Sequence, residues 1–278
     1  MPAAPAKTMM TNKQAYKIRA AACLYVATLL LSACGQSTMP EFTVFDPREQ
    51  RQRDRSGTFT GADGITIHLR EDRRHIGDED VRRLAELTQV KLNLEMAATD
   101  EMVAIACRTK PQMAMLVPEG RHEITTEGGL DVLAQETRLK DVIARLADAG
   151  IVTSVFIDAE PAQIEAAARI GARVCEIHTG PYAHAFHAAG RDAEAPAVLA
   201  ELDKIRTAGE VVRSLGMRFN AGHALNYYNV QPIARLPGIR ELHIGHSIVS
   251  RSVFSGMREA VREMKRLMRE GAALGRQA

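Results

Sequence analysis

From about Gly61 to the C-terminus, short runs rich in β-branched residues alternate with longer segments that carry charged residues along one face. The short runs are typical of buried parallel strands, and the longer segments are typical of helices on the outside of a sheet. Regular alternation of the two predicts an α/β fold in which helices cover a parallel sheet. This pattern constrains the fold more than any other feature of the chain.

The pattern places seven strands, over 64–69, 91–96, 113–118, 152–157, 173–178, 217–222 and 241–245. Helices are expected over 78–89, 100–109, 130–149, 162–170, 196–215, 231–236 and 255–270. We therefore expect a (β/α)8 TIM-type barrel that is missing or replacing its first β/α unit, with an open doubly wound sheet as the alternative. The run 42–45 is the only nearby segment with strand character, and it could substitute for the missing strand.

Composition narrows the function classes. Of the 278 residues, 46% are apolar and 25% are charged, as in an ordinary globular protein. The formal net charge is +2, and acidic residues interrupt the basic ones, so no basic tract is available to neutralise a nucleic-acid backbone. Cysteines at 23, 34, 107 and 175 form no Cys-x-x-Cys pair and no zinc-finger spacing, so neither a disulfide framework nor a metal site is predicted.

The N-terminal region differs from the rest of the chain. Several basic residues precede an apolar run over 20–31, which ends in Leu-Ser-Ala-Cys34. This arrangement is typical of a bacterial lipoprotein signal, and the run is too short to span a bilayer comfortably. Residues 1–34 are thus either such a signal, which would anchor the chain to a membrane through Cys34, or a spurious extension. Residues 35–60 are expected to be a linker and 61–278 the barrel domain.

Ionisable residues stand at or near the carboxyl ends of five predicted strands: His68 and Arg70, Glu95, Glu176 and His178, His223, and His246. Because burying an unpaired charge is costly, charges at equivalent strand ends indicate either a ring of salt bridges or a polar active site. We favour the active site, since carboxylates together with histidines can move protons near neutral pH.

Three places near these strand ends could hold phosphate groups. Arg70 lies close to Arg73 and Arg74 in the sequence, and Thr125-Thr-Glu-Gly-Gly129 offers hydroxyls and backbone amides to an anion. Gly245 and His246 follow the last strand, where barrels often bind phosphate. Phosphate-binding groups beside acid–base residues indicate a pair of small phosphorylated substrates.

Six runs carry a family resemblance: Gly-Ile-Thr-Ile-His-Leu-Arg-Glu-Asp-Arg-Arg-His75, Asn-Leu-Glu-Met96, Thr-Thr-Glu-Gly-Gly-Leu-Asp131, Glu-Ile-His-Thr-Gly180, Asn-Ala-Gly-His223 and Ile-Gly-His246. In order and spacing they closely resemble pyridoxine 5′-phosphate synthases, over about residues 61–270. The resemblance implies condensation of 1-deoxy-D-xylulose 5-phosphate with 3-amino-2-oxopropyl phosphate, giving pyridoxine 5′-phosphate, phosphate and water. It also implies that no metal or redox cofactor is needed.

Residue roles follow from the same resemblance. His68 and Glu95 resemble the family's proton acceptors, His223 its proton donor, and Glu176 the carboxylate that stabilises a transition state. The residues that resemble its substrate-binding groups are Arg70, His75 and Thr125 for the deoxyxylulose phosphate, Gly245 and His246 for the amino-ketone phosphate, and Ala224 beside the second phosphate. The family further implies a homo-oligomer, an octamer, in the cytoplasm.

The chain departs from the family pattern at three places. The family's first strand, with an Asn-x-Asp-His motif and a following Arg, has no counterpart. Ala224 stands where the family usually has Gly, and Tyr228 where it usually has His. The alternative function is therefore an inactive, truncated or lipid-anchored remnant that binds phosphate ligands at most, and a third is another barrel enzyme acting on small sugar phosphates.

Overall fold

The computed structural model describes residues 41–45, 61–119 and 128–276. The chain divides into two compact units, Met1–Ser37 and Thr38–Ala278, and all of the described residues lie in the second. The signal predicted over 1–34, with Cys34, and the phosphate ligand predicted at Thr125 therefore lie outside the described residues.

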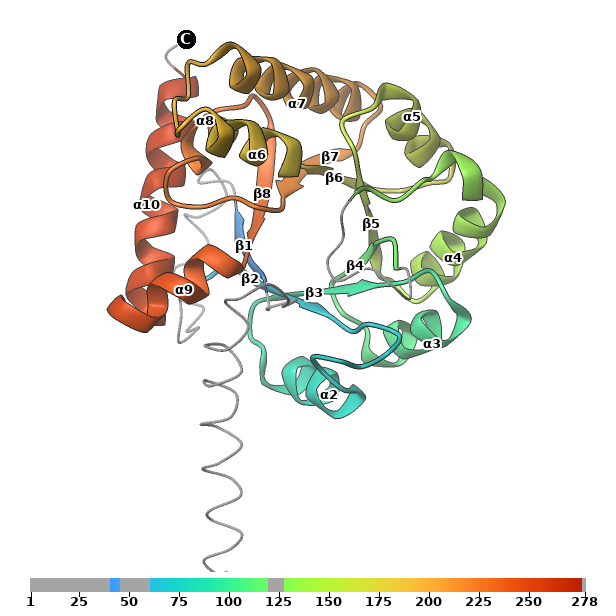
Figure 1. Ribbon diagram of the computed structural model, residues 1–278. Helices are drawn as coiled ribbons and strands as arrows, with labels where there is room; N and C mark the ends of the chain where they lie inside the picture. The colour runs from blue at the N-terminus through green and yellow to red at the C-terminus, as the bar shows by residue number, and fades with distance from the viewer. Residues whose placement is uncertain (1–40, 46–60, 120–127, 277–278) are drawn as a thin grey trace, which may run out of the picture. The chain divides into compact units, whose positions relative to one another are not determined.

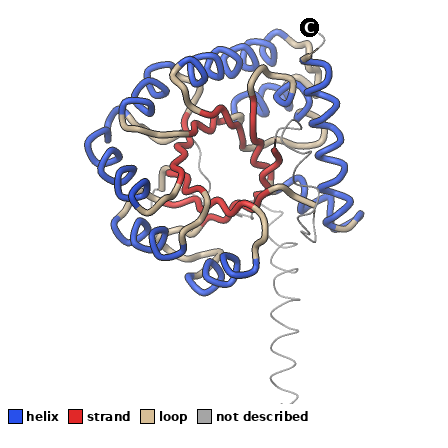
Figure 2. Tube along the Cα trace, turned by 180° about the vertical axis from the view of Figure 1, so that it is seen from behind, coloured by secondary structure: helices blue, strands red, loops and turns tan. Residues whose placement is uncertain are grey.

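Within these ranges, strands follow one another in chain order around a closed barrel (Figures 1 and 2). They are β1 (Glu41–Phe45), β2 (Gly64–His68), β3 (Lys91–Met96), β4 (Met113–Leu116), β5 (Val152–Ile157), β6 (Val174–His178), β7 (Arg218–Gly222) and β8 (Ile239–Ile244). All neighbours from β2 to β8 pair in parallel. The barrel prediction is confirmed, and the seven strands predicted after Gly61 are found within one or two residues of the expected bounds.

The barrel is closed by a strand that runs against the others. β1 pairs antiparallel with β2, where Phe42 lies opposite Ile65, and antiparallel with β8, where Phe42 lies opposite Ile244. Without β1, the facing edges of β2 and β8 would leave their backbone groups unpaired. Residues 41–45 thus belong to the barrel and not to the linker expected over 35–60, and they form the substitute strand that the sequence offers. Residues 41–45 can take this place because an antiparallel strand satisfies the backbone donors and acceptors of the two open edges as well as a parallel strand would.

Helices cover the outside of the barrel (Figure 2). They are α2 (Asp78–Leu87), α3 (Asp100–Thr109), the 3₁₀ turn η2 (Leu133–Gln135), α4 (Glu136–Asp148), α5 (Pro161–Arg169), α6 (Gly180–Ala188), α7 (Pro196–Ser214), α8 (Val230–Ala234), α9 (His246–Ser255) and α10 (Met257–Gly275). The helix expected over 130–149 begins at Glu136, because Gln163 accepts hydrogen bonds from the amides of Val132 and Leu133 and holds that stretch in another conformation.

Two helices are absent from the sequence prediction. α6 contains no Asp, Glu, Lys or Arg and is apolar except for His184 and His187, so it lacks the charged face on which the prediction rests. α9 contains four serines and two valines, which favour helices weakly, yet it packs against α10. The helix expected over 255–270 is confirmed as α10, which begins at Met257 because Gly256, with a φ of +78°, separates it from α9.

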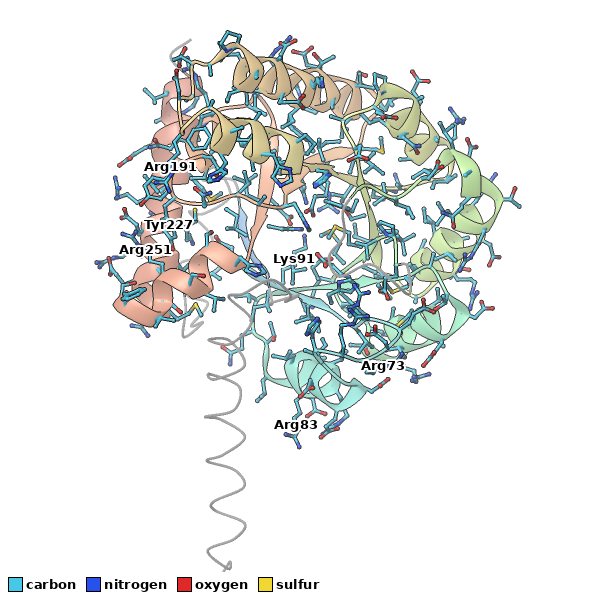
Figure 3. All side chains as sticks on the ribbon, viewed as in Figure 1. Arg73, Arg83, Lys91, Arg191, Tyr227 and Arg251 are labelled. Carbon is cyan, nitrogen blue, oxygen red and sulfur yellow. The ribbon has the colours of Figure 1, made fainter. Side chains whose placement is uncertain are left out.

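The interior of the barrel is unusually polar. Inward-facing positions carry buried polar side chains, among them Thr66, Asn93, Ser154, Asn220 and Glu241. Met115, Val117 and Phe156 form a small apolar cluster among the buried residues. Lys91 lies within the ring of strands, whereas Arg83 and Arg251 lie on the outer helices (Figure 3). Since such barrels are normally filled by branched aliphatic residues, the polar interior needs internal partners for its charges.

Candidate functional site

His68 lies between two carboxylates that come from different strands. Its Nε2 lies 2.8 Å from Oε1 of Glu119, and its Nδ1 lies 3.5 Å from Oε2 of Glu95. The side chains of His68 and Glu119 are each 4% exposed, and that of Glu95 is 14% exposed. The amide of Glu71 also donates to Glu119, at 3.0 Å. Burial opposes ionisation of Glu119, but the hydrogen bonds from His68 and Glu71 outweigh it and hold the pKa of Glu119 below its ordinary value.

The rings of Phe156, His178 and His223 form a second cluster of side chains, at the carboxyl ends of β5, β6 and β7. The rings of His178 and His223 lie edge to face with centroids 5.3 Å apart, and Phe156 contacts both. Nδ1 of His178 lies 2.9 Å from Oδ1 of Asp158. This contact is the main reason why the pKa of Asp158 is lowered. Burial lowers the pKa of His223 to about 4, and the nearby imidazoles of His178, His246 and His68 add to the effect.

The backbone after β7 is held in an uncommon conformation. His223 and Ala224 have φ values of +84° and +57°, in a region that side chains disfavour. The hydroxyl of Thr179 donates to the carbonyls of Gly222 and His223, at 2.6 and 2.5 Å, and so holds the turn in place. Strain of this kind costs about 1–3 kcal/mol per residue and is common at functional sites. The turn directs His223 toward the ring group.

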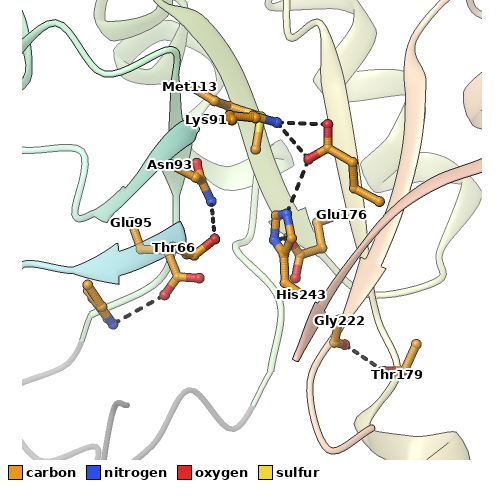
Figure 4. A network of polar contacts seen from close by, with 11 residues as sticks. Thr66, Lys91, Asn93, Glu95, Met113, Glu176, Thr179, Gly222 and His243 are labelled. Carbon is orange, nitrogen blue, oxygen red and sulfur yellow. Dashed lines mark hydrogen bonds and ion pairs between the residues drawn. The ribbon is translucent and has the colours of Figure 1, made fainter. Parts of the chain in front are cut away.

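Glu176 lies deeper than the sequence suggests, in the interior below the strand ends (Figure 4). Its side chain is 1% exposed, and its Oε2 contacts Nδ1 of His243. A side chain at Gly222 would bring a Cβ to 2.2 Å from Oε1 of Glu176, so this position admits only glycine. One carboxylate oxygen therefore contacts His243 on β8, and the other packs against Gly222 on β7.

A row of buried charges leads from Glu176 through His243 to Lys91 (Figure 4). Nε2 of His243 lies 3.4 Å from Oε2 of Glu241, and Nζ of Lys91 lies 2.6 Å from the same oxygen. Burial alone would lower the pKa of His243, but Glu176 and Glu241 outweigh it and raise this pKa to about 10. Burial likewise opposes ionisation of Glu241, but His243 and Lys91 lower its pKa to about 2. The charges alternate in sign along this row, so attraction between neighbours offsets the free-energy cost of burying them.

The predicted phosphate ligands lie in two places. Arg70 and His75 follow β2, and the pKa of His75 is lowered by burial and then by the charges of Arg70 and Arg74. Gly245 precedes α9 as its N-cap, and His246 is the first residue of that helix. The first amides of a helix have no partner within it and attract anions. The carbonyl of Ala224 accepts a hydrogen bond from Asn229 at 3.2 Å.

The structure brings most of the predicted site residues together at the carboxyl end of the barrel. His68 and Glu95 are in contact, and His68 is close enough to both His75 and His223 to influence their pKa values. Glu176 contacts His243 in the interior and packs against Gly222, the residue before His223. Three site residues escaped the sequence analysis: Glu119, Asp158 and His243. The first two follow β4 and β5 closely, so a search for ionisable residues at the carboxyl end of every strand would have found them.

The cysteines within the described part of the chain behave as small hydrophobic residues. Cys175 is fully buried, and burial raises its pKa to about 12, while Cys107 is partly buried. Among the described residues, no group of three or more His, Cys, Asp and Glu side chains is arranged to hold a metal ion. No helix in these ranges is long and apolar enough to cross a membrane.

Comparison with known sequences identifies close relatives. The family model for pyridoxal phosphate biosynthesis protein PdxJ matches residues 52–270. A pyridoxine 5′-phosphate synthase of Aromatoleum aromaticum is 84% identical over 216 residues, which cover 78% of this chain and 86% of that protein. The synthase of Azoarcus sp. is 86% identical over 213 residues, covering 77% and 86%. The synthase of Rhodopirellula baltica is 51% identical over 244 residues, covering 88% and 92%.

Solved structures resemble the fold at low sequence identity. One is the Amycolatopsis orientalis BexX/CysO complex, with a TM-score of 0.51 at 15% identity over 79% of this chain and 83% of that one. Another is a 4-hydroxy-2-oxoglutarate aldolase, with a TM-score of 0.50 at 16% identity over 74% and 81%. At such identities the likeness concerns the barrel fold alone.

Proposed function

The chain belongs to the family of pyridoxal phosphate biosynthesis protein PdxJ, and from this premise we propose that it is a pyridoxine 5′-phosphate synthase. It condenses 1-deoxy-D-xylulose 5-phosphate with 3-amino-2-oxopropyl phosphate, and it releases pyridoxine 5′-phosphate, phosphate and water. Relatives at 82–86% identity carry this name.

The observation that carries the proposal is the meeting of acid–base groups from several strands at one end of the barrel. His68 and Glu95 lie at the carboxyl ends of β2 and β3, His178 ends β6, and His223 follows β7. Ring closure requires successive proton transfers around one bound intermediate, from carbon, nitrogen and oxygen in turn. Groups placed on two sides of the barrel mouth can serve those transfers without the intermediate leaving the site.

The two sides differ in protonation, which suits them to different steps. His68 lies in contact with the carboxylate of Glu95, and an imidazole and a carboxylate in contact can take a proton from the substrate and pass it on, so this side is the proton acceptor. His223 is neutral at pH 7 because its pKa is lowered to about 4. A neutral imidazole carries one N–H and one free nitrogen, so it can donate to a leaving oxygen and be reprotonated.

Both substrates carry phosphate, and each end of the mouth offers cationic or amide donors. Arg70 and His75 hold the phosphate of the deoxyxylulose substrate, together with Thr125, which lies outside the described residues. The N-terminus of α9, at Gly245 and His246, and the backbone at Ala224 hold the phosphate of the amino-ketone. The amino-ketone phosphate is retained as the 5′-phosphate of the product, so the phosphate that leaves is that of the deoxyxylulose substrate, where the cationic Arg70 stabilises the departing dianion.

Assembly and location extend the proposal. We infer a homo-oligomer, an octamer as in the family, that works in the cytoplasm without a metal or redox cofactor. The alternative location is the membrane surface, through a lipidated Cys34. Mass spectrometry of the protein isolated from its native host would distinguish a diacylated Cys34 at the N-terminus from an unprocessed chain that starts at Met1.

The test is an assay of the purified full chain with both phosphorylated substrates, following pyridoxine 5′-phosphate and released phosphate. We expect equal amounts of the two products, and none when either substrate is left out. A chain that is folded by circular dichroism and yet forms no product would contradict the proposal and favour the inactive remnant. Turnover of another sugar phosphate alone would favour a different barrel enzyme.

A further inference from the structure

Among the described residues, Glu119 lies nearer to the ring of His68 than Glu95 does. Its Oε1 lies 2.8 Å from Nε2 of His68 across 51 residues of sequence. Resting on the function proposed above, we propose that Glu119 is a positioning residue: it fixes the ring of His68 and stabilises the imidazolium that forms when His68 accepts a proton.

The burial and hydrogen bonding of His68 and Glu119 indicate a specific interaction and not an incidental contact. Both side chains are 4% exposed, so water does not compete for the hydrogen bond. The second oxygen of Glu119 accepts the amide of Glu71 at 3.0 Å, which orients the carboxylate from the loop after β2. A carboxylate held in this way accepts from the N–H of a histidine, sets its tautomer and stabilises its charged form.

The arrangement leaves the opposite nitrogen of His68 for the reaction. With Nε2–H donating to Glu119, Nδ1 is the nitrogen that can take up a proton, and Glu95 lies 3.5 Å from it. Glu95 is the more exposed of the two carboxylates, at 14% against 4%. Glu95 is therefore the more accessible carboxylate, and in the proposed arrangement Glu119 acts only through His68.

The described charged and titratable groups around His68 come from several elements. They are Glu95 on β3, Glu119 after β4, Arg70 and His75 after β2, and His223 after β7. Among these groups Glu119 is the one in hydrogen-bond contact with His68 and is buried with it, so we expect its removal to affect His68 the most.

The experiment compares Glu119→Gln with the wild-type full chain and with Glu165→Gln, which removes an exposed carboxylate from α5. Glutamine keeps an oxygen for the amide of Glu71 but loses the negative charge beside His68. We expect kcat to fall about tenfold to a thousandfold in Glu119→Gln. KM for both substrates should change less than about threefold, and Glu165→Gln should match the wild type.

The pH profile separates this role from a merely structural one. A histidine that loses an adjacent carboxylate gives up its proton more readily, so the acidic limb of kcat in Glu119→Gln should move to lower pH. Glu119→Asp, which keeps the charge, should recover part of the rate and the wild-type limb. A Glu119→Gln variant with wild-type kcat and an unmoved limb would overturn the inference.

A measurement on the unmodified protein keeps the inference testable if the variant does not fold or if the wild type lacks synthase activity. In ¹⁵N spectra of the histidine rings, assigned with His68→Asn, we expect Nε2 of His68 to carry a proton at pH 8. An unprotonated Nε2 at that pH would refute the pair with Glu119, whatever the outcome of the synthase assay. Loss of activity in the wild type with a protonated Nε2 would instead refute only the proposed function.

Discussion

Two buried histidines have pKa values shifted in opposite directions. His223 follows β7, and His243 lies in the neighbouring strand β8. His223, in the mouth of the barrel, has rings as neighbours, and burial lowers its pKa to about 4. His243, in the interior, lies between Glu176 and Glu241, and these carboxylates outweigh burial and raise its pKa to about 10. At pH 7 the mouth holds a neutral imidazole that can exchange protons, and the interior holds a cation.

The comparison teaches that burial alone does not set the charge of a histidine in this barrel. The partners supplied by adjacent strands decide it, and they divide the molecule into two levels. We expect the mouth to determine the reaction rate and the interior charges to determine the stability. The predictions below test that division.

Glu95→Gln should have the largest effect on rate and little effect on stability. Glutamine has nearly the same shape but does not accept a proton at neutral pH, so we expect turnover to fall about 10²- to 10⁴-fold. Steady-state assays with both substrates measure the loss, and thermal unfolding should give a Tm close to that of the wild type. Equal turnover in this variant would remove Glu95 from the catalytic machinery.

Glu241→Gln should show the opposite behaviour in the interior. It leaves Lys91 and His243 buried without their shared carboxylate, and breaking such a pair costs about 3–5 kcal/mol of unfolding free energy. Denaturant unfolding measures the loss. The exposed pair of Arg206 and Glu210 provides the control, since Glu210→Gln should cost less than about 1 kcal/mol. Similar losses of unfolding free energy in both variants would mean that the buried charges stabilise the fold no more than an exposed ion pair does.

The pH dependence of stability should separate the two histidines. The folded pKa of His223 lies below the ordinary 6.5, so its contribution is present above pH 6.5 and is lost as the pH falls toward 4, by about 3 kcal/mol. The folded pKa of His243 lies above 6.5, so its contribution is present below pH 6.5 and is lost as the pH rises through about 10.

Unfolding free energies measured from pH 4 to 10 check both limbs. His223→Asn should flatten the acidic limb and leave the alkaline limb, while His243→Asn should do the reverse. If His223→Asn changed the alkaline limb of the stability curve, or His243→Asn the acidic limb, the mouth and the interior of the barrel would not be independent.

Ala224→Gly should have the smallest effect. At a φ of +57° alanine is strained and glycine is not, so the change should stabilise the chain by about 0.5–1 kcal/mol. Removal of the methyl group should also lower KM for the amino-ketone phosphate. Ala221→Gly, in the buried strand β7, is the matched control and should be destabilising. A destabilised Ala224→Gly would show that the strain at this turn has been assigned to the wrong residue.

Local patterns predicted much of the site. His68, Glu95 and His223 were predicted at strand ends because parallel strands place their carboxyl ends at one mouth, and the structure brings them near one another. Glu176 was predicted at the same mouth, but it lies in the interior against His243. A period of two gives the face of a strand and not the depth at which a side chain finds its partner.

The sequence by itself determined the alternation of strands and helices, the barrel, and the residue types of the acid–base site. These follow from periodicity and chemistry that are local in the chain. Only the tertiary structure decided that β1 closes the barrel antiparallel, that Glu119 meets His68, and that His223 and His243 differ in charge. Each of these depends on which distant residues become neighbours, and edge pairing and burial settle that only when the whole barrel is assembled.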